Sequence, residues 1–165
     1  MKILILSDTH IPGRAKKLPK KLIDACQTAD FIVHAGDWQT MDVYHELAAY
    51  APTDGVCGNV DPWEIADSFG HKKVLTLDNL KVGVVHGDGG SKTTEQRAVD
   101  AFKDLEVDII VFGHSHIPVM REKNGVILFN PGSPTDKRMQ SQFSFGILET
   151  GDSWELKHVF FDKEN

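Results

Sequence analysis

Apolar runs and segments of helical periodicity alternate in the first third of the chain. Three short apolar runs predict strands, at residues 2–7, 31–34 and 54–57. Two segments predicted as helices lie between them, over residues 18–29 and 41–50. The first of these places apolar residues on one face, at Leu18, Leu22, Ile23 and Cys26. This β-α-β-α-β order is typical of parallel strands flanked by helices.

The pattern changes after residue 70, where strands predominate. Asp78-Asn79 and Asn124-Gly125 mark two hairpin turns, and one helix is predicted over 93–104, with Ser91 or Thr93 as its cap. The strand-like runs of this part are residues 74–77, 80–85, 108–112, 117–122, 126–130, 143–149 and 153–161. This mixed order predicts an α/β fold, a two-sheet β-sandwich core flanked by helices, in one domain spanning residues 1–165.

The chain is acidic, with 18 basic and 24 acidic residues among 165 and a net charge of −6 when histidines are neutral. We expect the basic residues to be dispersed and not gathered on one stretch. Nonspecific binding to nucleic acid relies on clustered cations, so none is expected. A protein of this charge that handles phosphate needs positive charge from another source, and a metal ion would supply it.

The first apolar run, Ile3-Leu4-Ile5-Leu6, is too short for a signal peptide or a membrane span. A cytoplasmic protein with no membrane contact is therefore expected. Cys26 and Cys57 lie 31 residues apart without a CxxC motif, so we expect two reduced thiols.

Potential metal ligands follow five of the predicted strands. The carboxyl ends of parallel strands line one edge of a sheet, so side chains at these ends can meet although they are far apart in sequence. In an extended segment residues two apart face the same way, which pairs His114 with His116. The five segments are Asp8-Thr9-His10, His34-Ala35-Gly36-Asp37, Gly58-Asn59, His86-Gly87 and Gly113-His114-Ser115-His116.

Each segment also has an ordinary structural interpretation. An isolated Asp-x-His or Gly-Asn is as readily a turn or a helix cap, and His86 alone would more often be a strand-end histidine. His-x-His pairs also occur on solvated loops. Five such segments, each at the end of an apolar strand, are improbable as coincidence, and together they predict a dinuclear metal site.

These segments, with Asn130-Pro131-Gly132-Ser133 after the late hairpin, resemble the calcineurin-like metallophosphoesterases, in particular their small single-domain bacterial and archaeal phosphodiesterases. The resemblance implies a four-layer α/β/β/α fold. It implies one metal held by Asp8, His10 and His116, a second held by Asn59, His86 and His114, and Asp37 as the bridge. Asp37, Asn59 and His86 are expected to act directly in catalysis.

The implied cofactors are two divalent ions, with Mn²⁺ favoured and Fe, Ni²⁺ or Zn²⁺ as alternatives, because imidazole and oxygen ligands without thiolate suit these metals. Two such ions roughly 3.5–4 Å apart lower the pKa of a shared water and provide a hydroxide for in-line attack on phosphorus.

The chain departs from the family pattern at three places. Relatives commonly carry a proton-donating histidine where Val60 stands, which favours diesters and activated esters over alkyl monoesters. Asp88 replaces a frequent histidine and is read as a loop carboxylate. Trp38 is expected either to pack in the core or to stack on a substrate ring. Three residues could replace the missing acid, each with a structural alternative: His34, Asp61 and His71.

The sequence thus predicts a metal-dependent phosphodiesterase acting on a small phosphoester, with a nonhydrolytic scaffold or a phosphomonoesterase as alternatives. The scaffold alternative arises because Ser7-Asp8-Thr9-His10-Ile11-Pro12 also resembles a retromer subunit of the same fold. The physiological substrate depends on cleft walls expected in loops 61–73 and 134–142, and a homodimer stays open.

Overall fold

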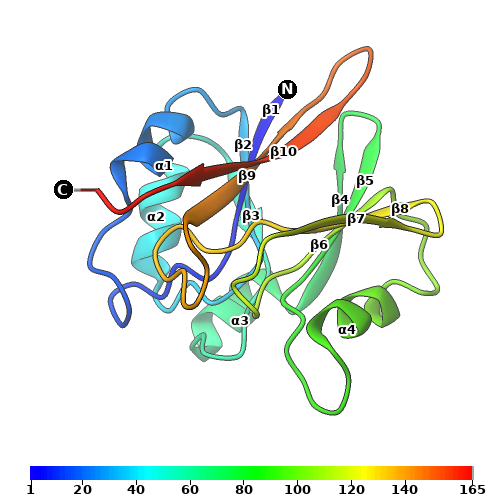
Figure 1. The fold of residues 1–165 in the computed structure, drawn as a ribbon, viewed down its shortest axis with the longest axis horizontal. Coiled ribbons are helices and arrows are strands. Elements are labelled where there is room, and N and C mark those ends of the chain that lie inside the picture. Colours follow the sequence, from blue (N-terminus) through cyan, green and yellow to red (C-terminus); the bar gives the residue numbers. More distant parts are fainter. Residues whose placement is uncertain (165) are drawn as a thin grey trace.

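Two mixed five-stranded sheets lie face to face in the computed structural model, which describes residues 1–164 (Figure 1). The first sheet has the order β10-β9-β1-β2-β3 and the second the order β4-β5-β6-β8-β7. The strands are β1 (Lys2–Leu6), β2 (Phe31–His34), β3 (Thr53–Gly55), β4 (Lys72–Leu77), β5 (Leu80–Val85), β6 (Ile109–Val111), β7 (Val119–Lys123), β8 (Val126–Asn130), β9 (Phe143–Glu149) and β10 (Glu155–Phe161).

The second sheet has a parallel centre and antiparallel edges, whereas the first is parallel on the β1-β2-β3 side and antiparallel on the β9-β10 side. In the first sheet β1, β2 and β3 run parallel, and β9 pairs antiparallel with β1. In the second sheet β5, β6 and β8 run parallel, while β4 and β7 pair antiparallel with their neighbours. Five of these parallel strands, β1, β2, β3, β5 and β6, precede the predicted ligand segments, and the sixth, β8, leads into the Asn130-Pro131-Gly132-Ser133 segment.

Three apolar clusters fill the spaces between four layers. Along β1, alternate side chains point to opposite faces: Ile3 and Ile5 pack between the two sheets, and Leu4 and Leu6 pack under the helices. Helices α1 (Lys20–Cys26) and α2 (Met41–Ala48) cover the first sheet, and α4 (Thr94–Ala101) covers the second (Figure 1). The predicted α/β/β/α sandwich is confirmed.

Helix boundaries differ from the expected ones by a few residues. Helix α1 begins at Lys20 and not at Leu18, because Leu18 precedes Pro19 and such residues disfavour the helical region. The Pro19 carbonyl accepts the N–H groups of Leu22 and Ile23 and starts the helix there. Helix α4 is capped by Thr93, whose side chain accepts the N–H of Gln96 at 3.1 Å, so the second of the two expected caps is the one used.

One helix was not expected. Residues 61–73 were predicted as a loop, but Trp63–Phe69 form helix α3. The helix has only seven residues and follows Pro62, so its sequence carries too few turns to show a clear period. It buries Ile65 against the cluster under α1 and α2.

No helix within residues 1–164 combines the length and hydropathy needed to cross a bilayer. Cys26 and Cys57 are separate buried thiols, as expected.

Candidate metal centre

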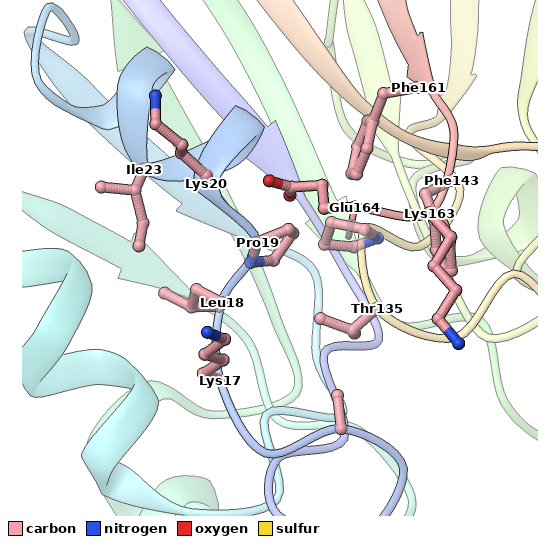
Figure 2. Close-up of a pocket in the computed structure, with 12 residues that line it drawn as sticks. Lys17, Leu18, Pro19, Lys20, Ile23, Thr135, Phe143, Phe161, Lys163 and Glu164 are labelled. Carbon is pink, nitrogen blue, oxygen red and sulfur yellow. The ribbon is translucent and has the colours of Figure 1, made fainter.

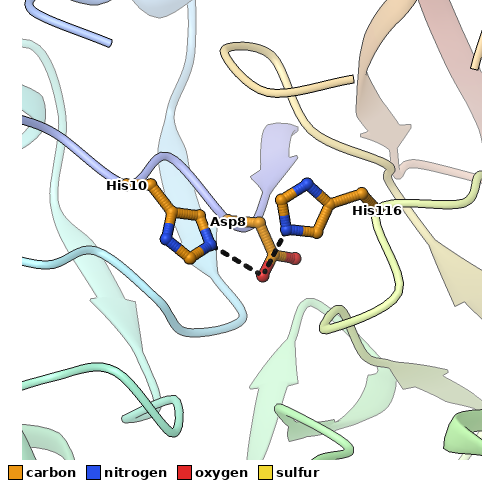
Figure 3. A group of neighbouring side chains, drawn as sticks. All are labelled: Asp8, His10 and His116. Carbon is orange, nitrogen blue, oxygen red and sulfur yellow. Dashed lines mark ion pairs between the residues drawn. The ribbon is translucent and has the colours of Figure 1, made fainter. Parts of the chain in front are cut away.

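The five ligand segments meet at one end of the sandwich, where the parallel strands of both sheets terminate. Two groups of potential ligands form there, with the ligand atoms of each group within 4.8 Å of one another. The first group is Asp8, His10 and His116 (Figure 3), and the second is Asp37, His86 and His114. The division matches the one implied by the family resemblance.

Asp8 presents one carboxylate oxygen to the centre. Its Oδ2 accepts hydrogen bonds from the Ser7 hydroxyl at 2.8 Å and from the His114 backbone N–H at 3.0 Å. Its Oδ1 makes no hydrogen bond and lies 3.5 Å from Nε2 of His116 and 3.7 Å from Nε2 of both His10 and His86. Two donors thus fix the carboxylate so that the other oxygen faces three imidazoles.

Asp37 lies between the two groups. Its Oδ2 is 3.1 Å from Nε2 of His86 and 3.4 Å from Nε2 of His10, which belong to different groups. Its Oδ1 accepts the Val60 backbone N–H at 3.1 Å. Asp37 Oδ2 therefore lies within reach of ligand atoms from both groups.

The two histidines of the second group are oriented by contacts of their Nδ1 atoms with a backbone carbonyl and a side-chain amide. The ring of His86 is oriented by the Ala35 carbonyl, 2.8 Å from Nδ1, which accepts the Nδ1 proton and leaves Nε2 free to act as a ligand. His114 is half-buried, and its Nδ1 lies 3.2 Å from Oδ1 of the exposed Asn59. The structure thus brings Asn59 to the second group.

The centre fits a pair of divalent cations. Four inward-facing atoms, Asp8 Oδ1 and Nε2 of His10, His86 and His116, have no hydrogen-bond partner within residues 1–164. Buried polar atoms are normally paired, so four unpaired ones at one point indicate a missing ligand. Neighbouring ligands of one ion at about 2.1 Å lie roughly 3.0–3.4 Å apart, which agrees with the 3.1 Å between Asp37 Oδ2 and His86 Nε2.

Electrostatics favour the same conclusion. Burial acts to raise the pKa of Asp8, but His10, His116 and His86 outweigh it and hold that pKa well below its usual range. Burial acts to lower the pKa of His86, and the contact with Asp37 and the charge of Asp8 overcome it and raise the pKa to about 9. The two carboxylates thus stabilise positive charge here, and a cation competes with the His86 proton for them.

The backbone at the centre is strained. Asp8, His10, Asp37, His114 and His116 all have positive φ, between 45° and 71°. Such conformations cost non-glycine residues about 1–3 kcal/mol each and concentrate at functional sites. The sharp turns that aim these side chains inward are therefore maintained by the surrounding packing.

Two glycines allow the loops to approach one another. A Cβ at Gly58 would overlap the Asp37 carboxylate, and a Cβ at Gly113 would overlap the Ser7 hydroxyl and lie 2.6 Å from Asp8 Oδ2. Any larger residue at either position would displace a ligand.

Supporting residues that the sequence analysis did not assign lie in the segment 130–135. Ser133 Oγ donates to the Asp8 carbonyl at 2.8 Å, and Thr135 Oγ1 donates to the Thr9 carbonyl at 2.7 Å. Asn130 Nδ2 donates to the Gly113 carbonyl at 3.0 Å. The Asn-Pro-Gly-Ser segment was noted for its family resemblance, and its role is to tie two ligand loops together.

Asp61 is a further supporting residue. Its hydrogen bonds are inconsistent with a role as the proton donor that replaces the histidine absent at Val60. Its carboxylate accepts the backbone N–H groups of Asp37 at 2.9 Å, Gly58 at 2.8 Å and Gln39 at 2.7 Å. Burial raises the pKa of Asp61, while these hydrogen bonds act to lower it. The side chain is engaged in holding the Asp37 loop.

His34 and Trp38 belong to the core. His34 Nδ1 accepts the Gly36 N–H at 3.1 Å, and its Nε2 contacts the Thr9 hydroxyl at 3.1 Å. Burial lowers the pKa of His34 to about 3, so the ring is neutral. Trp38 is fully buried and stacks on His34, with ring centroids 3.9 Å apart, so the expectation that it stacks on a substrate is wrong and the packing alternative holds.

His71 and Asp88 are exposed, in line with their loop interpretations. A groove of about 600 Å³ lies between the start of α1 and the end of β10 and contains none of the seven predicted ligands (Figure 2). Leu18, Ile23, Phe143 and Phe161 contribute its apolar walls.

Comparison with known proteins gives the same family. The calcineurin-like phosphoesterase superfamily domain matches residues 1–153. A probable metallophosphoesterase of Methanothermobacter thermautotrophicus is 34% identical over 139 residues, which cover 84% of this chain and 80% of that protein. A phosphodiesterase of Methanocaldococcus jannaschii is 28% identical over 149 residues, covering 80% of this chain and 83% of that protein.

The fold is shared with solved structures. Vps29 of Chaetomium thermophilum superposes with a TM-score of 0.81 at 20% identity, covering 99% of this chain and all of that one. At that identity the likeness shows the fold alone. The family match over residues 1–153 and the 34% identity to a metallophosphoesterase establish that the chain belongs to the calcineurin-like phosphoesterase superfamily.

Proposed function

We propose that this chain is a divalent-metal-dependent phosphodiesterase with a dinuclear centre. One observation carries the proposal: Asp37 lies within 3.4 Å of an imidazole from each of two ligand groups, and four buried atoms around it have no partner within residues 1–164. A site with a single ion would not need a carboxylate between two groups.

The proposed ligands divide as their positions suggest. Asp8, His10 and His116 would hold one ion, and Asn59, His86 and His114 would hold the other, with Asp37 available to both. Such ions, when bound, supply a water of lowered pKa and Lewis acidity towards phosphoryl oxygens. The nitrogen and oxygen donors favour Mn²⁺, with Fe, Ni²⁺ or Zn²⁺ as alternatives.

The chain's own residues would orient and neutralise the reacting groups. Asp37, Asn59 and His86 are proposed to act directly: Asp37 and His86 are buried 3.1 Å apart at the centre, and the exposed Asn59 contacts His114 beside them. The Ala35 carbonyl and the Asp61-bound loop hold His86 and Asp37 in these positions.

A preference for diesters with good leaving groups follows from the surroundings of Val60. Val60 is 46% exposed and lines a pocket beside His10, and its methyl groups offer no proton to a leaving oxygen. Of the three alternative donors, His34 is buried and neutral, Asp61 is engaged with backbone N–H groups, and His71 is exposed and does not line the pocket beside Val60. The phosphodiesterase relative from Methanocaldococcus jannaschii supports the same class.

A nonhydrolytic scaffold is the second candidate, favoured by the fold shared with Vps29. The complete set of proposed ligands argues against it, because binding a partner does not require seven metal-binding side chains.

The test uses two chromogenic esters with Mn²⁺. Purified protein is expected to hydrolyse bis(p-nitrophenyl) phosphate faster than p-nitrophenyl phosphate, and Asp37→Asn is expected to abolish this activity. Asp67→Asn, on the exposed face of α3, serves as the matched control and should leave it unchanged. An equal or reversed preference would indicate a monoesterase. Absence of turnover with every divalent ion would indicate the scaffold.

A further inference from the structure

A second cavity adjoins the metal centre on the side of the first ligand group. It encloses about 270 Å³ and is lined by His10, Gly13, Arg14, Gln39, Val60 and Arg138. This volume is below the usual range for a whole small-molecule ligand, so it suits one chemical group of a larger molecule. Apart from His10, the only ionisable residues of this lining are the two arginines, which are always positively charged.

Both arginines are carried by segments anchored to ligands of the first group. The backbone N–H of Arg14 donates to the His10 carbonyl at 2.7 Å. The Asp136 carbonyl, two residues before Arg138, lies 2.5 Å from Nδ1 of His116. The backbone at both arginines is therefore anchored beside the metal centre, while their side chains are 69% and 49% exposed and accessible to a ligand.

One carboxylate stands between the two guanidinium groups. Asp136 Oδ2 lies 3.9 Å from Nε of Arg14 and 3.9 Å from Nε of Arg138. Within residues 1–164 neither guanidinium donates a hydrogen bond, and neither has another acidic partner. Two positive charges and one negative charge leave the group at +1, with its N–H donors free.

The chain around Arg14 is basic, although Lys17 and Lys20 line the other groove and Lys20 pairs with Asp24 at 2.7 Å. Residues 14–21 contain five basic residues, Arg14, Lys16, Lys17, Lys20 and Lys21, out of 18 in the chain, and no acidic one. The expectation that the basic residues are dispersed is therefore wrong for this segment. A local positive field raises the rate at which anions reach the cavity.

We propose that Arg14 and Arg138 bind a second phosphate group of the substrate, and that the substrate is therefore a phosphodiester that also bears a phosphate monoester. The inference rests on the proposed hydrolysis at the metal centre and names the substrate class for it. Guanidinium groups match phosphate oxygens with paired N–H donors. Gln39, whose Oε1 accepts the Gly13 N–H at 2.7 Å, retains its amide N–H groups as further donors.

Val60 contributes an apolar side chain to the lining of the cavity. Among the lining residues only His10 is a proposed metal ligand, so a phosphate bound there by the arginines would lie beside the metal centre. The cavity would thus favour diesters that carry a phosphate monoester near the scissile bond.

The experiment compares a thymidine dinucleotide with the same dinucleotide bearing a 5′-phosphate. Turnover is measured with Mn²⁺, and binding is measured separately by calorimetry on the full chain in EDTA at low ionic strength, where no hydrolysis occurs. The variants are Arg14→Gln, Arg138→Gln and the double substitution. Arg121→Gln is the matched control, because this exposed arginine on β7 pairs with Glu95 at 3.0 Å and lies outside the cavity.

The wild-type chain should favour the phosphorylated dinucleotide in kcat/KM and in binding, and each arginine variant should reduce that preference by about tenfold, the scale of a charge-assisted hydrogen bond. The double variant should abolish the preference, and Arg121→Gln should retain it. An equal or undetectable affinity for the two dinucleotides overturns the proposal, as does a preference that survives the double variant or is lost equally in Arg121→Gln.

The two proposals fail separately. Hydrolysis of both dinucleotides without preference removes the second phosphate site and leaves the phosphodiesterase intact. Arginine-dependent binding in EDTA without turnover under any metal keeps the phosphate site and removes the phosphodiesterase.

Discussion

Replacing Asp61 by Asn tests whether this carboxylate holds the metal-centre loops or acts as a proton donor. Its Oδ2 accepts two backbone N–H groups, from Asp37 and Gly58, and its Oδ1 accepts a third from Gln39 at 2.7 Å. An asparagine oxygen in place of Oδ2 keeps the first two bonds without the charge. Its NH₂ group then faces the Gln39 N–H, donor against donor.

The magnitude follows from these three contacts. A hydrogen bond to a charged group contributes about 1.5–3 kcal/mol and a neutral one about 0.5–1.5 kcal/mol. One bond lost and two weakened amount to about 4 kcal/mol, and partial exposure of Asp61 reduces this to about 3 kcal/mol. In a domain of this size that corresponds to a fall in Tm of about 6–12 °C.

The assay is urea unfolding followed by circular dichroism, with Asp67→Asn on α3 as control. Asp67 is exposed, so its substitution should change the free energy of unfolding by less than about 0.5 kcal/mol. Metal content of the purified Asp61→Asn variant should also fall, because the Asp37 loop is released. The reasoning is refuted if Asp61→Asn is as stable as the control and loses activity only with poor leaving groups, since that is the behaviour of a proton donor.

Three further predictions concern the core and the metals. Burial lowers the pKa of His34 from its ordinary 6.5 to about 3 in the folded chain. Below pH 6.5 the unfolded chain binds a proton at His34 that the folded chain does not, so the free energy of unfolding falls as the pH decreases from 6.5 towards 3. Between pH 7.5 and pH 5.0 the wild type should lose about 2 kcal/mol from this group, and His34→Gln should lack that component in urea titrations at the two pH values. Trp38→Phe removes the hydrogen bond from Nε1 to the Val56 carbonyl, so it should destabilise the fold by about 2 kcal/mol without changing the preference among diesters. Trp63→Phe is the control, because the Trp63 side chain is 80% exposed and its substitution should leave stability unchanged. Mn²⁺ at 100 times its Kd should stabilise the chain by about 2.7 kcal/mol for each ion bound, relative to EDTA, in thermal unfolding, and an equal Tm in both conditions would contradict the metal centre.

The sequence alone was sufficient for the fold class, and it supplied seven candidate ligands, six of which the structure gathers into two groups. Strand β1 alternates Ile3 and Ile5 with Leu4 and Leu6 because it lies between two apolar layers, and that period of two is legible without coordinates. Asp8 and His10 follow directly on this strand, so their place at its carboxyl end was determined locally. Helix α3 was missed because seven residues after Pro62 are too few to show a helical period.

Tertiary structure decided how those side chains are used. Asp8 offers only Oδ1 to the centre because Oδ2 is engaged by the His114 N–H, 106 residues away, and its carbonyl is held by Ser133, 125 residues away. Trp38 lies beside Asp37 in sequence yet packs into the core, because β2 and β3 bring the Val56 carbonyl to its indole nitrogen. Arg14 and Arg138 meet at Asp136 for the same reason. Periodicity is a local property of the chain, whereas these contacts exist only after two sheets have packed together and aligned their strand ends.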